Sequence, residues 1–196
     1  QRANVFRYET KATRPFLRSR EFYWIETHCV FPTSEAAMRQ VHEDMDTTQE
    51  VLHDALGLPF LFFERPAWDK FPGASRTFAA DVLNPDGKFV QQPSTHLISQ
   101  DFLKAFDVNF KNANGESETP FSTCYGPAIS RILASVVIVH GDDKGLRYPW
   151  SITPIHIVFV PLSEAGEKRA HELCKKLPSN ISYEIDTSDK SPGEKF

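Results

Sequence analysis

The stretch RPFLRSREFYWIETH, residues 14–28, gathers side chains that bind phosphates, bases and amino groups. Side chains of a strand alternate between its two faces. One face of a strand here would carry every second residue from position 18: Arg18, Arg20, Phe22, Trp24, Glu26 and His28. A guanidinium gives paired hydrogen bonds to a phosphate, an aromatic ring stacks on a base, and a carboxylate accepts from an amino group. The row therefore predicts a site for a nucleotide and an amine.

Positive charge is concentrated at the start of the chain. Residues 1–20 hold six cationic side chains and one acid, Glu9, although the formal net charge of the 196 residues is −4. Such a local excess suits an anionic ligand such as a polyphosphate. The net charge gives no argument for a DNA or membrane partner, and no apolar run reaches the roughly 20 residues of a membrane helix.

Cysteine usage and the first residues indicate the compartment. Cys29, Cys124 and Cys174 are far apart and form no C-x-x-C pair, which predicts neither a disulfide framework nor a zinc site in this segment. The polar, basic beginning has no signal-peptide pattern. These features predict a cytoplasmic protein.

The elements that must position the row begin with a long hairpin. Residues 4–9 and 18–30 are its expected strands, with residues 10–17 as the loop between them. Thr33 and Ser34 offer N-cap hydroxyls for a helix whose apolar side chains recur to Leu56. Further along, the patterns predict a buried strand at 59–64, a strand–turn–strand at 76–92, a short helix near 98–106 and a polar turn at 112–120.

The apolar segment at 127–141 fits a buried helix with small residues, although its Val/Ile run also fits a strand. Arg131 lies near its start, where burial without a partner is costly, so a functional role is favoured. A strand, helix and strand are expected at 154–162, 163–177 and 181–187, an order that indicates a parallel sheet. The predicted domains are residues 1–149 and 150–196.

Four ordered stretches carry a family resemblance. FRYET…RPFLRSREFYWIETH resembles motif 2 of class II aminoacyl-tRNA synthetases, in the form found in prolyl-tRNA synthetases of the archaeal and eukaryotic type. DKFPGA, QQPSTHLISQDF and CYGPAISR…VHGDDKGL follow in the family's order, the last with motif 3. The resemblance implies an α/β (α+β) fold: an antiparallel sheet flanked by helices, then the start of an α/β anticodon-binding domain.

The resemblance also implies roles for individual residues. Those implied to bind ATP are Arg7, Glu9, Arg18, Phe22, Gln91, Ser94, Ile129, Ser130 and Arg131, with Gln91 also a contact for Mg²⁺. Those implied to bind L-proline are Arg7, Trp24, Glu26, His28 and His96. Arg7 and Arg131 would be catalytic, because attack of an already ionised carboxylate on the α-phosphate needs positioning and positive charge rather than a base.

The resemblance further implies transfer of proline to its tRNA by a homodimeric enzyme. The family's motif 1 and its Thr-x-Glu loop would precede residue 1, and a zinc-binding tail would follow residue 196, so the 196 residues alone are expected to be inactive. Two alternatives stay open. One is a non-catalytic paralogue that binds tRNA or nucleotide, which has no need of both phosphate-binding arginines. The other is a class II synthetase for another small amino acid, and the lack of a metal-ligand set near His96 disfavours threonine.

Overall fold

Five antiparallel strands form the central sheet of the structure, a computed structural model that describes residues 1–195. The strands lie in the order β3-β9-β6-β5-β4, and the chain divides into two units, residues 1–147 and 148–196. The elements of the first unit are β1 (Arg2–Phe6), β2 (Glu21–Ile25), β3 (Thr27–Phe31), α1 (Ser34–Thr48), η1 (Gln49–Ala55), β4 (Phe60–Glu64), β5 (Ala74–Leu83), β6 (Phe89–Ile98), α2 (Gln100–Ala105), β7 (Phe110–Lys111), β8 (Ser117–Glu118), β9 (Phe121–Tyr125), α3 (Ile129–His140), β10 (Gly141–Asp142) and β11 (Gly145–Leu146).

The predicted long hairpin is present, but its second strand is interrupted. β1 pairs with β2 from Arg2↔Ile25 to Phe6↔Glu21, whereas β3 pairs with β9 in the central sheet. At the break, the backbone N–H of Ile25 donates to the carbonyl of Pro127 at 3.0 Å. A single predicted strand at 18–30 was therefore wrong, because the chain changes sheets at Glu26.

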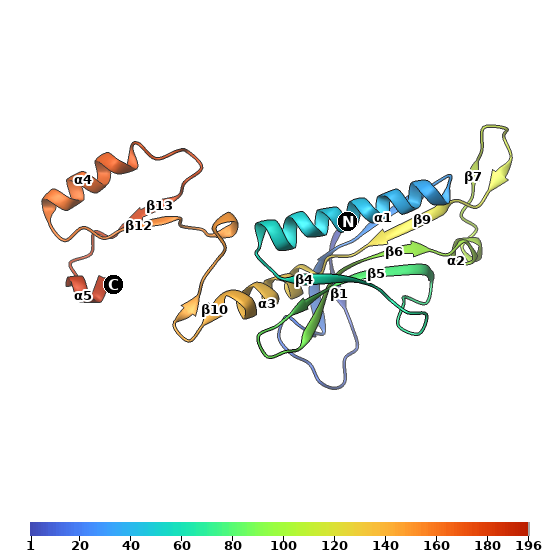
Figure 1. The fold of residues 1–196 in the computed structure, drawn as a ribbon, viewed down its shortest axis with the longest axis horizontal. Coiled ribbons are helices and arrows are strands. Elements are labelled where there is room, and N and C mark those ends of the chain that lie inside the picture. Colours follow the sequence, from blue (N-terminus) through green and yellow to red (C-terminus); the bar gives the residue numbers. More distant parts are fainter. Residues whose placement is uncertain (196) are drawn as a thin grey trace. The chain divides into compact units, whose positions relative to one another are not determined.

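Helix α1 covers one face of the central sheet. Its N-cap is Thr33, whose hydroxyl accepts from the backbone N–H of Ala36 at 3.2 Å. The fully buried Ala37 and Val41 pack on Phe78 and Leu97 of the sheet, as the apolar spacing predicted. Figure 1 shows α1 running along β6 and β9. The helix then continues directly into the π-helical segment η1.

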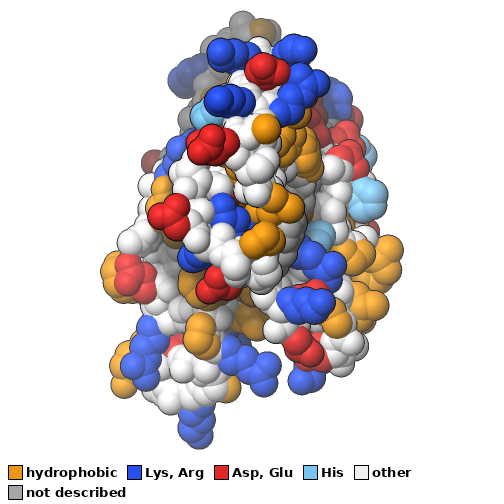
Figure 2. Space-filling view, turned by 90° about the vertical axis from the view of Figure 1, so that its left-hand side faces the viewer, with side chains coloured by type: hydrophobic (Ala, Val, Ile, Leu, Met, Phe, Trp, Pro, Cys, Tyr) orange, Lys and Arg blue, Asp and Glu red, His pale blue; other side chains and the backbone are white. Residues whose placement is uncertain are grey.

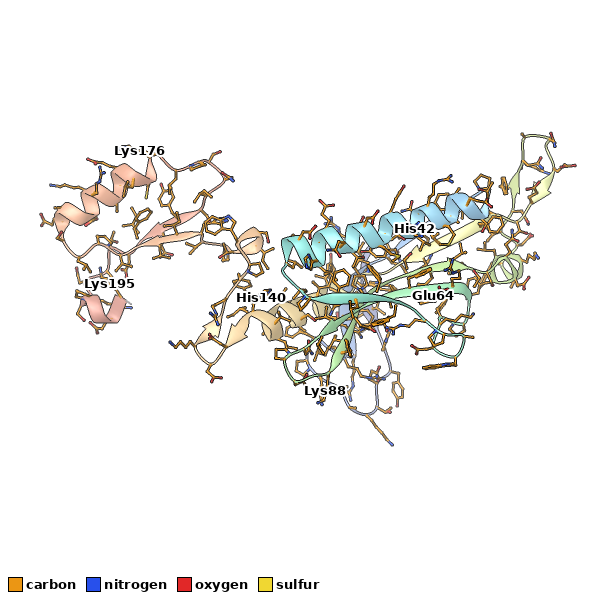
Figure 3. The ribbon with its side chains drawn as sticks, in the orientation of Figure 1. His42, Glu64, Lys88, His140, Lys176 and Lys195 are labelled. Atoms are coloured by element: carbon orange, nitrogen blue, oxygen red, sulfur yellow. The ribbon has the colours of Figure 1, made fainter. Side chains whose placement is uncertain are left out.

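The segment at 127–141 is the helix α3 rather than a strand. Its Ile132 and Val136 pack with Leu52, Leu58 and Val82 into a second hydrophobic cluster. At its end, His140 Nε2 donates to the carbonyl of Leu56 at 2.7 Å, which joins α3 to the turn after η1 (Figure 3). His140 thus has a structural contact at the end of α3.

Strand β4 is an edge strand, although the sequence predicted a buried one. The side chains of Leu61 and Phe63 are 59% and 42% exposed. A short apolar run does not reveal whether both faces of a strand will be covered. Glu64 at the end of β4 pairs with Arg76 of β5, with Oε1 and Nε 2.7 Å apart.

The second unit contains the predicted β-α-β order. Its elements are η2 (Trp150–Ile152), β12 (Ile157–Phe159), α4 (Glu164–Cys174), β13 (Tyr183–Ile185) and α5 (Pro192–Lys195). β12 and β13 pair in parallel, from Ile157↔Tyr183 to Phe159↔Ile185. On the face shown in Figure 2, acidic and basic side chains are interspersed. Within residues 1–195, no helix is both long and apolar enough to cross a membrane.

Candidate active site

The floor of the candidate site is a row of side chains across four neighbouring strands. His28 of β3 pairs with Cys124 of β9, Cys124 pairs with His96 of β6, and His96 pairs with Thr77 of β5. Directly opposite residues of antiparallel strands point to the same face of the sheet. The register therefore brings four positions that are distant in sequence onto one surface.

The adjacent row points to the other face, where α1 lies. There, the hydroxyl of Thr95 donates to Asp44 Oδ2 at 2.7 Å, and the hydroxyls of Tyr125 and Thr48 are 2.9 Å apart. Burial raises the pKa of the Asp44 carboxyl, while its hydrogen bonds to Thr95 and Gln40 oppose this rise. These contacts hold α1 against this face of the sheet. The opposite face, which carries the floor row, can therefore line a pocket.

The pocket above the floor has a volume of about 570 Å³, within the usual range for small-molecule sites. It brings together nine of the predicted site residues. These are Arg7, Phe22, Trp24, Glu26, His28, Gln91, Ser94, His96 and Arg131.

Trp24 forms part of the pocket wall and packs closely on the backbone beside it. A Cβ placed on Gly126 would lie 3.2 Å from Cζ3 of the Trp24 ring, so glycine permits this approach. The ring also meets Phe22 edge-on, with centroids 6.0 Å apart. Phe22 and Trp24 thus lie on the same side of β2, as the alternation of the row predicted.

His96 is fixed by hydroxyl groups at both ring nitrogens. Nδ1 lies 2.9 Å from Thr77 Oγ1, and Nε2 lies 3.0 Å from Ser94 Oγ. Phe71 covers the ring, with centroids 5.4 Å apart. Burial lowers the pKa of His96 to about 4, so the imidazole is neutral at pH 7. One nitrogen then donates a hydrogen bond and the other accepts one.

Glu26, His28 and Cys124 form a compact cluster beside His96. Glu26 Oε1 is 3.2 Å from His28 Nε2 and 3.7 Å from Cys124 Sγ, and Sγ is 4.0 Å from His28 Nε2. Burial, with the nearby Glu26 carboxylate, raises the pKa of the Cys124 thiol to about 12. The sequence predicted no metal-ligand set near His96, but the sheet register, which linear spacing does not show, brings these three potential donor atoms together.

Three arginines converge at the other end of the pocket. Arg7 and Arg131 line both the main pocket and an adjoining smaller hollow, and Arg18 lines the hollow. Burial lowers the pKa of Arg131, and the positive charges of Arg7 and Arg18 add to this effect. The Arg131 guanidinium donates to the carbonyls of Leu17 and Gln91, at 3.2 and 3.1 Å. Within residues 1–195, no carboxylate forms an ion pair with Arg131.

Four residues of the predicted nucleotide site contact one another in two pairs. Arg18 Nη2 is 3.1 Å from Glu9 Oε2, and the Arg7 guanidinium lies over the Phe22 ring, 5.0 Å from its centroid. Arg20, to which the sequence assigned no role, donates from Nε to the carbonyl of Glu9 at 3.1 Å. Arg20 therefore closes the base of the loop between β1 and β2.

Ile129 and Ser130 line neither hollow. Ile129 packs against the hydrophobic cluster of α3. The hydroxyl of Ser130 accepts from the backbone N–H of Tyr23 at 3.0 Å, so it connects α3 to β2. Contact of either residue with ATP stays a prediction.

The donor set near Gln91 fits Mg²⁺ only in part. Mg²⁺ is usually bound by one or two carboxylates together with substrate phosphates. The carboxylates that line the pocket are Glu26 and Asp69, and Asp69 is paired with Arg65 at 3.7 Å. Gln91 offers a single neutral oxygen, which suits an ion carried in by phosphate groups.

Comparison with known proteins agrees with this geometry. The family model described as "tRNA synthetase class II core domain (G, H, P, S and T)" matches residues 1–140. The chain belongs to this family. The match covers β1 to α3, which are the elements that build the pocket and the arginine cluster.

The chain is similar in sequence to proline–tRNA ligases. The chain is 45% identical to that of Thermofilum pendens and 41% identical to that of Methanocaldococcus jannaschii, over its whole length. The chain spans 42% and 44% of those two proteins, less than half of each.

Solved structures give the same result. The prolyl-tRNA synthetase of Giardia lamblia, in complex with prolyl-adenylate, matches with a TM-score of 0.91 and 33% identity, over the whole chain and 41% of that protein. The enzyme of Cryptosporidium parvum with L-proline and AMP matches with a TM-score of 0.90 and 29% identity, over the whole chain and 42% of that protein.

Proposed function

We propose that the intact protein activates L-proline with ATP to prolyl-adenylate and transfers the prolyl group to the 3′ end of proline tRNA. The observation that carries this proposal is the convergence of Arg7, Arg18 and Arg131 at one end of a pocket large enough for a small molecule. Three cations close together repel one another unless an anion joins them. A triphosphate supplies that anion, and the relatives that share the fold act on proline.

Arg7 and Arg131 have the reacting phosphate between them in this proposal. The proline carboxylate attacks the α-phosphate, the bond to the β-phosphate oxygen breaks, and pyrophosphate leaves. The nucleophile is already ionised at pH 7, so the protein supplies orientation and positive charge where negative charge develops. The half-buried Arg131 suits this task, because its carbonyl contacts leave its positive charge unneutralised.

The rest of the nucleotide would bind along the β1–β2 hairpin. Glu9 would exchange its ion pair with Arg18 for the adenine amino group, which would free Arg18 for the γ-phosphate. The Arg7 guanidinium would leave the face of Phe22, and the adenine ring would stack there instead. ATP thus replaces contacts that these residues make with one another.

Proline would occupy the end of the pocket over the floor row. Glu26 would accept from its ammonium, with the Trp24 ring and His28 as walls. The neutral His96 would offer a hydrogen-bonding edge without adding positive charge. A buried neutral imidazole suits a site that must hold an ammonium, since a charged one would repel it.

Gln91 and Ser94 both line the pocket, Gln91 beside Arg131 and Ser94 beside His96. Gln91 would hold Mg²⁺ through its amide oxygen, and the ion, when bound, neutralises phosphate charge. The residues 148–196 are proposed as part of an anticodon-binding domain. Homodimer assembly is likewise proposed, on the resemblance to the family alone.

Proline-dependent exchange of pyrophosphate with ATP tests the proposal, measured on the full-length gene product with Arg7→Ala and Arg131→Ala. Wild-type protein is expected to show proline-stimulated exchange, and each variant is expected to lose at least about 100-fold, the scale of one major electrostatic contact. Arg39→Ala is the matched control, because Arg39 is exposed on α1, on the other side of the sheet.

The outcomes separate the candidate functions. Exchange stimulated by threonine or serine but not by proline would assign the site to another amino acid. Binding of tRNA without exchange for any amino acid would indicate a non-catalytic paralogue. Equal losses in Arg39→Ala and Arg131→Ala would remove the arginine cluster from the mechanism.

A further inference from the structure

The cluster of Glu26, His28 and Cys124 offers three different donor atoms to one point in the pocket. All three donor atoms lie within 4.8 Å of one another, and it is the one such group of three among residues 1–195. An imidazole nitrogen, a thiolate sulfur and a carboxylate oxygen together are the donors that zinc prefers. Mg²⁺ and Ca²⁺ prefer oxygen donors alone.

The separations of these atoms match a tetrahedral ion. With usual zinc–ligand lengths, tetrahedral angles place nitrogen and oxygen about 3.3 Å apart, and sulfur about 3.5 Å from either. The structure has 3.2 Å from His28 Nε2 to Glu26 Oε1, 3.7 Å from Cys124 Sγ to Glu26 Oε1, and 4.0 Å from Sγ to Nε2. A shift of about 0.5 Å in one side chain completes the geometry.

The backbone holds two of the three donors in place. His28 and Cys124 are directly paired residues of β3 and β9, so their separation is set by the sheet. The second oxygen of Glu26 accepts from the side-chain amide of Gln1 at 3.2 Å, which leaves Oε1 for the cluster. Supporting hydrogen bonds of this kind orient the ligands of metal sites.

We propose that Glu26, His28 and Cys124 bind one zinc ion, whose fourth position faces the pocket, and that this ion competes with the amino-acid substrate. Zinc takes the place of the thiol proton, which is released to solvent as the sulfur–metal bond forms. The competition rests on the proposed function, in which Glu26 accepts from the substrate ammonium. Two cations cannot share that carboxylate oxygen, so zinc and amino acid exclude each other.

Cobalt(II) is the probe for the site, because a thiolate bound to Co²⁺ gives a charge-transfer band in the near ultraviolet. The full-length gene product is titrated with CoCl2 as wild type, Cys124→Ser and Cys29→Ser. Cys29 is the matched control, because it neighbours His28 in β3 but belongs to the row on the α1 side. We expect Cys124→Ser to lose one equivalent of cobalt–thiolate absorbance and Cys29→Ser to keep it.

Zinc inhibition of proline-dependent exchange is the second measurement. We expect ZnCl2 to raise the apparent KM for proline without lowering kcat, and we expect Cys124→Ser to need at least about tenfold more zinc for the same effect. An equal excess of MgCl2 should not reproduce the inhibition.

The two measurements fail in different ways. A cobalt–thiolate band that persists unchanged in Cys124→Ser would overturn the metal site, whether or not the protein activates proline. Zinc inhibition that is independent of proline concentration would overturn the competition. Absence of exchange with every amino acid contradicts the proposed function instead, and the cobalt titration still decides the metal site.

Discussion

The alternating side chains of β2 and β3 stay on one side although the single strand predicted from the sequence is broken in two. Phe22, Trp24, Glu26 and His28 all line one pocket, despite the change of sheet at Glu26. The sequence could therefore predict which side chains share a face before the strand boundaries were known.

Cys124 shows what sequence alone could not reveal at this scale. A lone cysteine in a strand has no sequence pattern that distinguishes a site from a core. Its contacts with Glu26 and His28 join positions up to 98 residues apart, and they follow only from the register of β3 with β9. Thr77 was missed for the same reason, because its bond to His96 depends on the pairing of β5 with β6.

His96 gives a prediction about pH. Its pKa in the folded chain is about 4, against an ordinary value of 6.5, so the unfolded chain binds a proton first as the pH falls. Stability is therefore lost between about pH 6.5 and about pH 4. We therefore expect the free energy of unfolding of the wild type to fall by up to about 3 kcal/mol more than that of His96→Gln when the pH is lowered from about 7 to about 4.5. Urea unfolding of the chain at both pH values measures the difference.

His42→Gln is the control for this prediction, because His42 is exposed on α1 (Figure 3). It should retain the pH dependence of wild type. If His96→Gln retains it as well, the neutral, buried state of His96 is refuted.

Helices were easier to predict than strands in this chain. The cap at Thr33 and the apolar spacing of α1 are local signals, and both were confirmed. The burial of β4 was mispredicted because it depends on whether both faces of the strand are covered, which a short apolar run does not show. The helix–strand ambiguity of α3 was resolved by packing, since Ile132 and Val136 meet the cluster below η1.

The attachment of α1 to the sheet gives a prediction for an element. Thr95→Val keeps the β-branched shape but removes the hydroxyl that donates to the buried Asp44 carboxylate. An oxygen left buried without a donor costs about 1–3 kcal/mol. We expect this loss in the free energy of unfolding at neutral pH, measured by urea unfolding followed by circular dichroism.

Thr47→Val is the comparison, because the Thr47 hydroxyl donates to a helix carbonyl on an exposed part of α1. A loss in Thr95→Val no larger than that in Thr47→Val would show that the Asp44 contact does not hold α1 on the sheet.

At the scale of the molecule, the two units differ in how much core they have. The first contains the clusters around α1 and α3, each with several fully buried side chains. Among residues 148–195, the buried apolar side chains are Ala170 and Cys174, and β12 and β13 have three residues each. So small a sheet is marginal without further packing.

Separate expression of the units tests this difference. Residues 1–147 are expected to unfold cooperatively on heating, because their sheet and clusters are self-contained. Residues 148–196 alone are expected to show no cooperative transition by circular dichroism. Cooperative melting of the smaller piece would mean that its strands and α4 carry more stability than their burial indicates.

The floor row of the pocket has a consequence for the order of folding. His28, Thr77, His96 and Cys124 meet only after β3, β5, β6 and β9 have all paired, across long stretches of chain. Closing such loops costs entropy before any contact offsets it, which makes non-local sheets slow to form. A chain emerging from the ribosome has no complete floor until residue 124 has joined the sheet. Ligand binding at this pocket would therefore report that the first unit has finished folding.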